Sequence, residues 1–376
     1  MLALFRDGQL KAEAAAERLG LARTRFYEVY SDYLQACAHR QQSTWTPGIS
    51  GGDHAPAWPA EVDALLHKRL GSKPPASYSF AASELFRKCQ FKATRAQVRR
   101  WAMQNNLAHL KPHHRPTAPV RRWQRSRIGE LWQLDATPHP WFPDCSQSFP
   151  MINMLDDCSR VFTASRIYQS ENLLAYFDLL PGAFTEFGLP LELYVDFHSF
   201  FFTHTPQALT QLGRALHFYG ITFRYAPTPQ AKGKIERSHF FWQERLPAYF
   251  ASENISDLDQ ANPHIQELRT HRNHHEIHRE LKMKPQQAWD LALKEKRSVL
   301  RPALHCPWWP FVWSQQNKVR VGDDGKVPVG PQRQSIDAPP RSKVIQCLRP
   351  DADIYYLHDA PDPNSQPIVL LHCPVF

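Results

Sequence analysis

Three acidic residues of this sequence stand in contexts where a carboxylate could do chemistry. Asp135 lies inside the strand-like run "LWQLDAT", Asp196 ends the run "LYVDF", and Glu236 stands in the first turn of a helical run, "AKGKIERSHFFWQERL". An unpaired carboxylate inside a strand is costly, and ligands of α/β sheets collect at strand ends. Three converging carboxylates would offer hard oxygen ligands to Mg²⁺ or Mn²⁺. Two such ions stabilise the attacking and leaving oxygens of an in-line displacement at phosphorus.

Glu236 and its lysine neighbours also have a simpler interpretation. A glutamate in the first turn of a helix interacts favourably with the helix dipole, and most such glutamates do nothing more. Lys232 and Lys234 would then be solvated cations at a helix end, whereas beside a phosphodiester site they would contact DNA phosphates. The helix also has a face that should pack on a core, made of Ile235, His239, Trp242 and Leu246.

The elements around these residues predict a mixed α/β sheet covered by helices. Three strand-like runs in close succession, "ELWQLDATPHPWF", "PMINMLDDCSR" and "VFTASRIYQ", predict an antiparallel meander. Helices and strands then alternate, with a helix over 171–187, a strand over 191–197, a helix over 206–219 and a strand over 221–227. The helix that carries Glu236 comes next. We expect this α/β core to span 128–292.

The C-terminal part has a different texture. From 293 to 376 the chain is rich in Pro, Trp and β-branched residues, which predicts a small all-β domain of barrel-like form. Within "KVRVGDDGKVPVG", the pair Asp324-Gly325 predicts a hairpin turn. The runs "SKVIQCLRP" and "DIYYLHD" predict further strands.

The N-terminal third carries the net positive charge of the chain. Residues 1–125 hold 20 Lys and Arg against 9 Asp and Glu, whereas 126–376 hold 25 against 27. From Lys68 to Arg125 there are 14 basic residues and one acidic residue, Glu84. Solvated surfaces usually mix both signs, so this bias favours binding to the phosphates of nucleic acid.

The first segment of this basic third, 1–45, has the layout of a helix-turn-helix unit. The run "KAEAAAERLGLARTRFYEVYSDYL" predicts a helix, a tight turn at Gly20 and a second helix. Arg23 and Arg25 stand at the start of that second helix, the part that such units place against DNA. Any three-helix bundle can produce the same pattern.

The layout recurs within 46–110. After a Pro- and Gly-rich stretch, a short helix over 81–88 and a turn precede a longer helix that begins at Thr94. The buried face of the longer helix should comprise Val98, Trp101 and Ala102, and its DNA-binding residues should be Arg95, Arg99 and Arg100. A basic Pro-rich linker, 111–127, follows, so we expect both units to fold separately from the core.

The acidic residues and their contexts resemble the catalytic core of DDE transposases of the bacterial insertion-sequence type, which share a ribonuclease-H-like fold with retroviral integrases. The resemblance covers about 126–292 and is carried by "GELWQLDAT", "LYVDFHSFF" and "TPQAKGKIERSHFFWQ". It implies that Asp135, Asp196 and Glu236 are catalytic residues that bind two Mg²⁺ or Mn²⁺ ions. The family often has Asn-Gly after its second aspartate, whereas Phe197 and His198 follow Asp196 here.

The resemblance also implies an activity and a set of partners. A DNA transposase of this kind binds terminal inverted repeats, hydrolyses the element ends to free 3′-hydroxyls and transfers them to target DNA. The other interpretation is a catalytically inactive or domesticated transposase-derived protein that only binds DNA. Joining two ends requires at least two catalytic cores, so we expect a homodimer or a higher oligomer on DNA.

Composition argues against other classes of protein. Apolar content of 42% with 12% aromatics is typical of a globular chain, and no apolar run reaches membrane-spanning length. The seven cysteines contain no CxxC pair, which predicts neither a disulfide framework nor a cysteine zinc site. This composition predicts a cytoplasmic protein without a membrane partner, and the resemblance implies that it is bacterial and nucleoid-associated when bound to DNA.

Two further clusters imitate metal sites. His271, His274, His275 and His278 have the spacing of ligands on one helix face, but no cysteine or carboxylate cluster accompanies them. The resemblance marks this segment as structural, and it likewise marks the adjacent Asp156 and Asp157 as non-catalytic.

Overall fold

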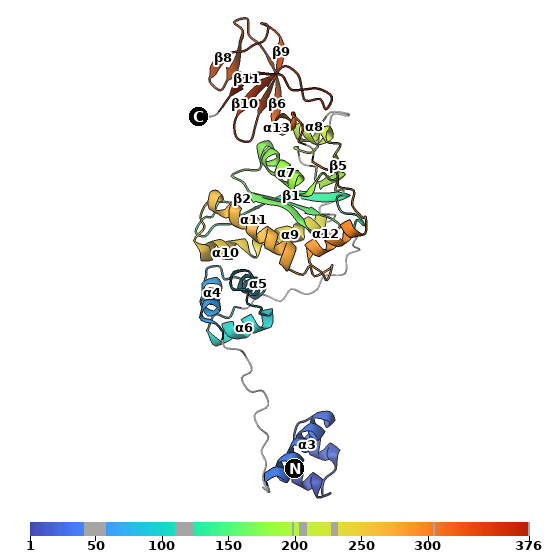
Figure 1. The fold of residues 1–376 in the computed structure, drawn as a ribbon. Helices are drawn as coiled ribbons and strands as arrows, with labels where there is room; N and C mark the ends of the chain where they lie inside the picture. Colours follow the sequence, from blue (N-terminus) through green and yellow to red (C-terminus); the bar gives the residue numbers. More distant parts are fainter. Residues whose placement is uncertain are drawn as a thin grey trace. The chain divides into compact units, whose positions relative to one another are not determined.

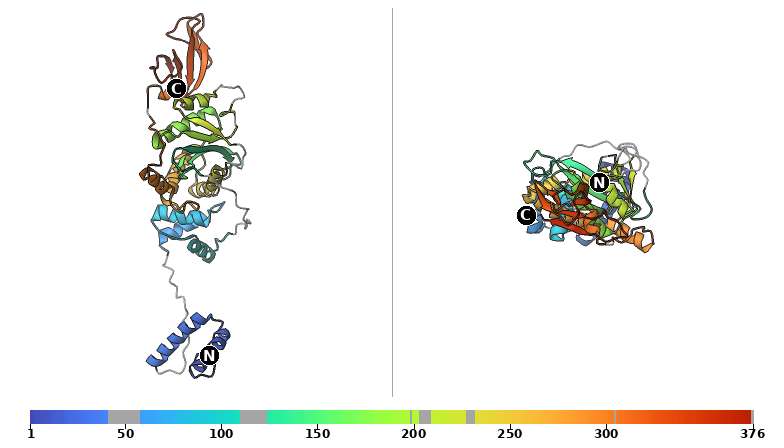
Figure 2. Two further views of the ribbon diagram at one scale, coloured as in Figure 1. Left: turned by 90° about the vertical axis from the view of Figure 1, so that its right-hand side faces the viewer. Right: turned by 90° about the horizontal axis from the view of Figure 1, so that it is seen from above.

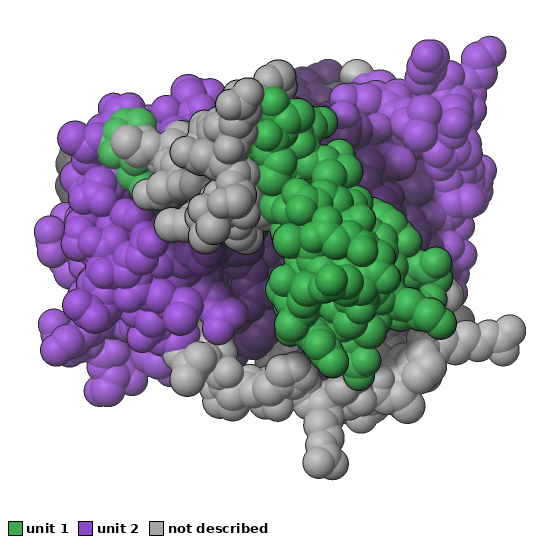
Figure 3. Space-filling model, turned by 90° about the horizontal axis from the view of Figure 1, so that it is seen from below, with its two compact units in different colours: residues 1–59 green, residues 60–376 purple. Residues whose placement is uncertain are grey.

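The computed structural model describes residues 1–40, 58–109, 124–197, 199–202, 209–226, 232–303 and 305–374. The chain divides into two compact units, residues 1–59 and residues 60–376, which Figure 3 distinguishes by colour. The described part of the chain contains no helix long and apolar enough to cross a membrane. The stretch 41–57 and most of the predicted basic linker (110–123) lie outside the described residues.

Within its described residues, the first unit contains three helices, which are α1 (Leu2–Arg6), α2 (Ala12–Arg18) and α3 (Arg23–Arg40). Their small core is formed by the buried Ala15, Ala16 and Phe26. Gly20 has a φ of +65°, a conformation that glycine adopts without strain, and it separates α2 from α3. The two helices and the turn that the sequence predicts are therefore confirmed.

The second unit begins with three more helices, which are α4 (Ala60–Leu70), α5 (Tyr78–Cys89) and α6 (Arg95–Gln104). Thr94 caps α6 together with Gln97, as the sequence predicts for the start of this helix. The predicted buried face is also confirmed, because Val98, Trp101 and Ala102 are buried. No helix was predicted over α4. α5 begins earlier than the predicted residue 81, because Ser77 accepts a hydrogen bond from the amide of Phe80 and caps the helix there.

The central sheet has five strands in the order β3-β2-β1-β4-β5 (Figure 1). The strands are β1 (Leu131–His139), β2 (Phe149–Asp156), β3 (Phe162–Ile167), β4 (Glu192–Val195) and β5 (Thr222–Tyr225). β1, β2 and β3 form an antiparallel meander, whereas β4 pairs in parallel with both β1 and β5. Parallel neighbours need crossover connections, and these contain α7 (Leu173–Phe187) and α8 (Gln211–Phe218). The predicted mixed sheet is confirmed.

Helices cover both faces of this sheet. α7 lies on one face, and α9 (Gly233–Gln243) and α11 (Leu258–His275) lie on the other (Figures 1 and 2). α9 contacts β1 and β2 through the face that the sequence predicts, which comprises the buried Ile235, His239, Trp242 and, just beyond the helix, Leu246. α10 (Leu246–Glu253) and α12 (Pro285–Lys294) complete this part of the unit.

The C-terminal part contains one short helix and two sheets. Its elements are α13 (Trp309–Val312), β6 (Gln315–Arg320), β7 (Lys326–Val329), β8 (Gln332–Ser335), β9 (Lys343–Leu348), β10 (Ile354–Leu357) and β11 (Val369–Cys373). The sheets have the orders β11-β10-β9-β6 and β7-β8. Closure into a barrel stays a prediction. Trp308, Phe311 and Trp313 belong to the same hydrophobic core as Phe184 of α7, so this part packs directly on the α/β core.

One predicted strand pairing is wrong. Gly325 does form a turn, with a φ of +66°, but β6 and β7 on either side of this turn do not pair with each other. β7 pairs with β8 across the next turn, where Gly330 also has a positive φ, and β6 pairs with the distant β9. The turn residues therefore predicted the position of the turn correctly but the strand pairing wrongly.

Buried charges join α4 and α5 to the helices of the core. The guanidinium of Arg69 donates hydrogen bonds to Glu84 Oε2 at 2.8 Å, to Glu253 Oε1 at 2.5 Å and to Ser252 Oγ at 2.7 Å. Arg69 and Glu84 are fully buried. Arg87 donates to the other oxygen of Glu84 at 2.6 Å. Residues 60–109 thus lie in the same compact unit as the core, although their sequence predicts a unit that folds separately.

Candidate active site

Asp135 and Asp196 come together because two neighbouring strands run in parallel. Gln133 of β1 is paired with Tyr194 of β4. Asp135 and Asp196 each stand two positions further along, and side chains two positions apart in an extended chain point to the same side of a sheet. Asp196 directly follows the last residue of β4. It therefore lies at the carboxyl end of this strand, where ligands of parallel sheets bind.

Lys232 connects these two carboxylates. Its ammonium nitrogen donates a hydrogen bond to Asp135 Oδ1 at 2.6 Å and lies 3.6 Å from Asp196 Oδ2. Only 6% of the lysine side chain is exposed, because it sits at the N-terminal end of α9 against the sheet. Two carboxylates held close together repel each other, and a buried cation between them reduces that repulsion. Lys232 was expected to be a DNA-phosphate contact or a solvated cation, and its contact with the two aspartates was not predicted.

His239 is a second α9 residue that faces Asp135. Its Nδ1 lies 3.8 Å from Asp135 Oδ2, and the side chain is buried. Burial lowers the pKa of His239, and the negative charge of Asp135 offsets only part of this lowering. The imidazole is therefore neutral at neutral pH. Within the described part of the chain, its Nε2 is buried without a hydrogen-bond partner. The sequence pattern placed His239 on the core face of the helix, which is correct, but gave no signal for its position beside Asp135.

Glu236 does not join the two aspartates. It is exposed on α9 four residues after Lys232, so it lies about one turn further along the same side of the helix. Among the residues that the structure describes, no group of three or more His, Cys, Asp or Glu side chains could hold a metal ion. The structure thus brings together two of the three predicted ligands.

The carboxylate oxygens of the two aspartates are suitable ligands for a divalent cation. Carboxylate oxygens are the ligands that Mg²⁺ prefers, and Asp135 and Asp196 already share one positively charged group. Asp135 is largely shielded from solvent, whereas Asp196 is half exposed and open to a substrate. These two residues are the ones that would hold such an ion, and Glu236 would have to approach them to complete the predicted set.

Lys234 and the adjacent aspartates have structural partners. The ammonium of Lys234 lies 2.5 Å from Oδ1 of the fully buried Asp157, which also accepts a hydrogen bond from Gln133 at 2.8 Å. Burial lowers the pKa of Lys234, and the charge of Asp157 raises it in part. Asp156 accepts hydrogen bonds from the amides of Gly129 and Ser159, and burial raises its pKa to about 6. These contacts attach α9 to the end of the sheet and hold the β2–β3 turn.

The predicted DNA-binding arginines differ in their surroundings. Arg23 and Arg25 of the first unit form exposed ion pairs with Glu13 at 3.3 Å and with Glu28 at 2.7 Å. On α6, three exposed arginines form no ion pair with any described residue. They are Arg95, Arg99 and Arg100. The basic face of α6 is therefore the more available of the two, and DNA binding by all five arginines stays a prediction.

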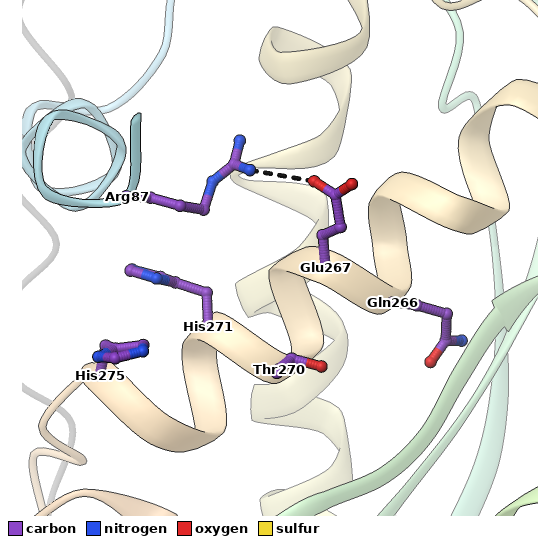
Figure 4. Close-up of a pocket in the computed structure, with 6 residues that line it drawn as sticks. All are labelled: Arg87, Gln266, Glu267, Thr270, His271 and His275. Carbon is purple, nitrogen blue, oxygen red and sulfur yellow. Dashed lines mark hydrogen bonds and ion pairs between the residues drawn. The ribbon is translucent and has the colours of Figure 1, made fainter. Parts of the chain in front are cut away.

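A pocket of about 480 Å³ lies between α5 and α11 (Figure 4), and neither Asp135 nor Asp196 lines it. Its lining comprises Arg87, Gln266, Glu267, Thr270, His271 and His275. Arg87 and Glu267 form an ion pair at 3.2 Å across it, and His271 Nε2 lies 3.0 Å from Ser83 Oγ of α5. The histidines thus take part in the packing of α5 on α11, which agrees with the structural role expected for this segment.

Two curated relatives are transposases. Over 255 residues the chain is 28% identical to the putative transposase y4bF of Sinorhizobium fredii, an alignment that covers 64% of this chain and 55% of that protein. Over 154 residues it is 32% identical to the transposase for insertion sequence IS1202 of Streptococcus pneumoniae, covering 39% of this chain and 32% of that protein. The chain therefore spans about half of the first relative and a third of the second. These relatives confirm the resemblance to transposases.

Other comparisons add less. No protein-family model matches the chain. A simian T-cell lymphotropic virus intasome in complex with PP2A regulatory subunit B56 gamma aligns with a TM-score of 0.38 and 16% identity, covering 78% of this chain and 99% of that chain. The HTLV-2 integrase catalytic core domain in complex with magnesium aligns with a TM-score of 0.30 and 16% identity, covering 43% and 94%. Scores this low support neither a shared fold nor a shared function.

Proposed function

We propose that this chain is a DNA transposase whose chemistry takes place at Asp135 and Asp196, with Glu236 as the third acidic residue. One observation carries the proposal. Two carboxylates on neighbouring parallel strands meet at a single buried cation, Lys232, at the edge of the sheet. Lys232 is buried and Asp135 is largely shielded from solvent, an arrangement typical of functional sites, and the half-exposed Asp196 leaves this group open to a substrate.

The residues of the chain would divide the work in a simple way. Asp135 and Asp196 would bind Mg²⁺ or Mn²⁺, which supplies Lewis-acid stabilisation of charge at phosphorus when bound. Lys232 keeps the two carboxylates together before that and holds the first turn of α9 against the sheet. The basic face of α6 would bind DNA phosphates, so that a phosphodiester reaches the carboxylates. End cleavage and transfer of 3′-hydroxyls to target DNA are the reactions that follow from the resemblance.

A second function is favoured by the position of Glu236. This residue is exposed and is not grouped with the two aspartates in the described part of the chain. A transposase-derived protein that binds DNA without cutting it would need no third ligand, so a catalytically inactive protein is the alternative.

Cleavage of the element's own end DNA separates these two functions. The wild-type protein should cut such DNA in Mg²⁺ or Mn²⁺, and Asp135→Asn should bind the same DNA without cutting it, because the substitution removes charge and keeps shape. Glu236→Gln should lose cleavage as well. Binding without cleavage by the wild-type protein would establish the alternative, and wild-type-like cleavage by Asp135→Asn would refute the assignment of the site.

A further inference from the structure

Two lysines at the start of α9 hold carboxylates of the sheet, and the surroundings of these carboxylates differ. Lys234 lies 2.5 Å from a carboxylate oxygen of Asp157, which is fully buried. Lys232 is itself buried, but its two partners are open to solvent in part. The side chain of Asp135 is 20% exposed and that of Asp196 is 50% exposed. Lys234 therefore belongs to a closed ion pair, whereas ions from solvent can reach the charges that surround Lys232.

The ammonium of Lys232 lies where the two aspartates meet. It donates a hydrogen bond to Asp135 Oδ1 at 2.6 Å. Its distance of 3.6 Å from Asp196 Oδ2 is too long for a hydrogen bond, so the attraction between these two groups is electrostatic. One positive charge balances one of the two negative charges. The group as a whole therefore still attracts cations.

The helix itself does not stabilise a cation at this position. Lys232 is the N-cap residue of α9, and its side chain makes no capping hydrogen bond. The N-terminal end of a helix carries a partial positive charge, which disfavours an ammonium group nearby. The two aspartates thus supply the stabilisation that keeps the ammonium in place, and loss of that stabilisation would free it.

A divalent ion that bridges the two aspartates would need the space in which the ammonium lies. Mg²⁺ binds carboxylate oxygens at about 2.0–2.1 Å, so an ion that bridges the facing oxygens of Asp135 and Asp196 lies between them. The nitrogen of Lys232 already contacts both of these oxygens. A doubly charged ion attracts the carboxylates more strongly than an ammonium does, and it repels the ammonium as well. The two cations therefore exclude each other.

On the basis of the proposed function, in which the two aspartates hold Mg²⁺ or Mn²⁺, we propose that Lys232 competes with the divalent ion for Asp135 and Asp196. In this structure the ammonium occupies the position that they share. It has to leave them before a divalent ion can bridge the same oxygens, and the start of α9 then loses one of its attachments to the sheet. Lys232 thereby determines how readily the acidic pair takes up metal.

Binding of Mn²⁺ in the absence of DNA tests this competition. Electron paramagnetic resonance measures the free ion, and the binding that disappears in Asp135→Asn is the binding at this site. Lys232→Gln removes the positive charge and should raise the Asp135-dependent affinity for Mn²⁺ on the order of ten-fold. Lys232→Arg keeps the charge and should raise the affinity much less. Lys234→Gln is the matched control two residues further along α9, and it should leave the affinity unchanged.

The displacement of Lys232 can also be measured in the wild-type protein. Treatment with an amine-acetylating reagent, followed by mass spectrometry of peptides, reports how accessible each lysine is. Lys232 should react slowly in EDTA, because it is buried, and several times faster in Mn²⁺. Lys234 remains paired with Asp157, so its rate should be the same in both conditions. This measurement needs no substitution, and it decides the matter even where Lys232→Gln does not fold.

Two results would overturn the competition. One is a folded Lys232→Gln protein whose Asp135-dependent binding of Mn²⁺ is absent or no tighter than that of wild type. The other is a reactivity of Lys232 that Mn²⁺ does not change. The proposed function is tested separately by cleavage of end DNA. A wild-type protein that does not cut such DNA refutes the proposed function, and the measurements without DNA still decide whether Lys232 competes with the ion.

Discussion

The helices α1–α3 and the helices α4–α6 share an order of elements and a basic last helix, yet they are held in different ways. The first three have their own small core, and their ion pairs, such as that of Arg23 with Glu13, are exposed. The second three place Arg69 and Glu84 fully inside the molecule, in contact with Glu253 of α10. Exposed ion pairs contribute little, whereas a buried charge that loses its partner is costly. Similar sequence patterns thus produce an independent unit in one case and an integral layer of the core in the other.

Two deletions should give the largest difference in stability between these two sets of helices. Removal of residues 1–57 takes away α1–α3 and should leave the stability of the rest unchanged. Removal of residues 1–110 leaves Glu253 and Glu276 without Lys68, Arg69 and Ser83, and we expect a loss of several kcal/mol or failure to fold. Urea denaturation followed by circular dichroism measures both. Equal stability of the two truncated proteins would show that α4–α6 are as separable as α1–α3.

Two single substitutions compare the contribution of a buried and of an exposed arginine to the free energy of unfolding. Arg69→Ala leaves Glu84 buried beside fewer positive charges and should cost about 3–5 kcal/mol in the free energy of unfolding. Arg23→Ala removes an exposed partner of Glu13 and should cost about 0–1 kcal/mol. Arg69→Lys keeps the charge but loses the forked geometry, so its stability should lie between wild type and Arg69→Ala. If Arg23→Ala proves the more destabilising, the two regions have been ranked in the wrong order.

Acid should act on the core residue Glu276, which accepts a hydrogen bond from Ser83 of α5 at 2.9 Å. Burial opposes ionisation of Glu276, but the ion pair with Arg245 at 2.6 Å outweighs it and lowers the pKa to about 2. A carboxyl with a lowered pKa contributes stability that is complete above its usual value of 4.5 and is lost as the pH falls towards 2. We expect this component to be on the order of 3 kcal/mol. Denaturation curves at pH 6 and pH 3 should therefore differ less for Glu276→Gln than for wild type, and Glu13→Gln should retain the full difference.

The smallest effects concern DNA. Arg99 of α6 is exposed and has no ion pair among the described residues, so its replacement by alanine should remove a phosphate contact and reduce the salt slope by about one unit. Arg25 is already paired with Glu28 at 2.7 Å, and Arg25→Ala should change the slope less. Gel-shift titrations across a salt series measure both slopes. A larger change for Arg25 would indicate that α3 is the main DNA-binding helix.

The sequence predicted those parts of the fold that depend on local pattern. Alternating and continuous apolar runs predicted β1 to β5, and their contexts predicted that Asp135 and Asp196 converge. Helix starts were correct where a capping residue was visible, as at Thr94. The unusual composition of 68–125 also contained a signal, because its single acidic residue, Glu84, is the buried partner of Arg69 and Arg87.

The remaining features depend on partners far away in the sequence. A lysine at the start of a helix is typical of a solvated cation, and nothing near Lys232 indicates Asp135 as its partner. Arg69 likewise meets Glu253 across more than a hundred residues, so its burial could not be predicted from the pattern around it. For a similar reason, β6 pairs with the distant β9 and not with the nearby β7, because the packing of whole sheets determines which strands pair.

The parallel pairing of β1 with β4 sets the stage of synthesis at which a newly made chain can assemble the acidic pair. Asp135 emerges from the ribosome first, but its strand meets β4 only after the meander and α7 have been synthesised. Lys232 follows later still. Any product of premature termination before residue 192 therefore contains one carboxylate without the other, and it cannot assemble the acidic pair. Such fragments retain the exposed arginines of α6, and they lack the acidic pair.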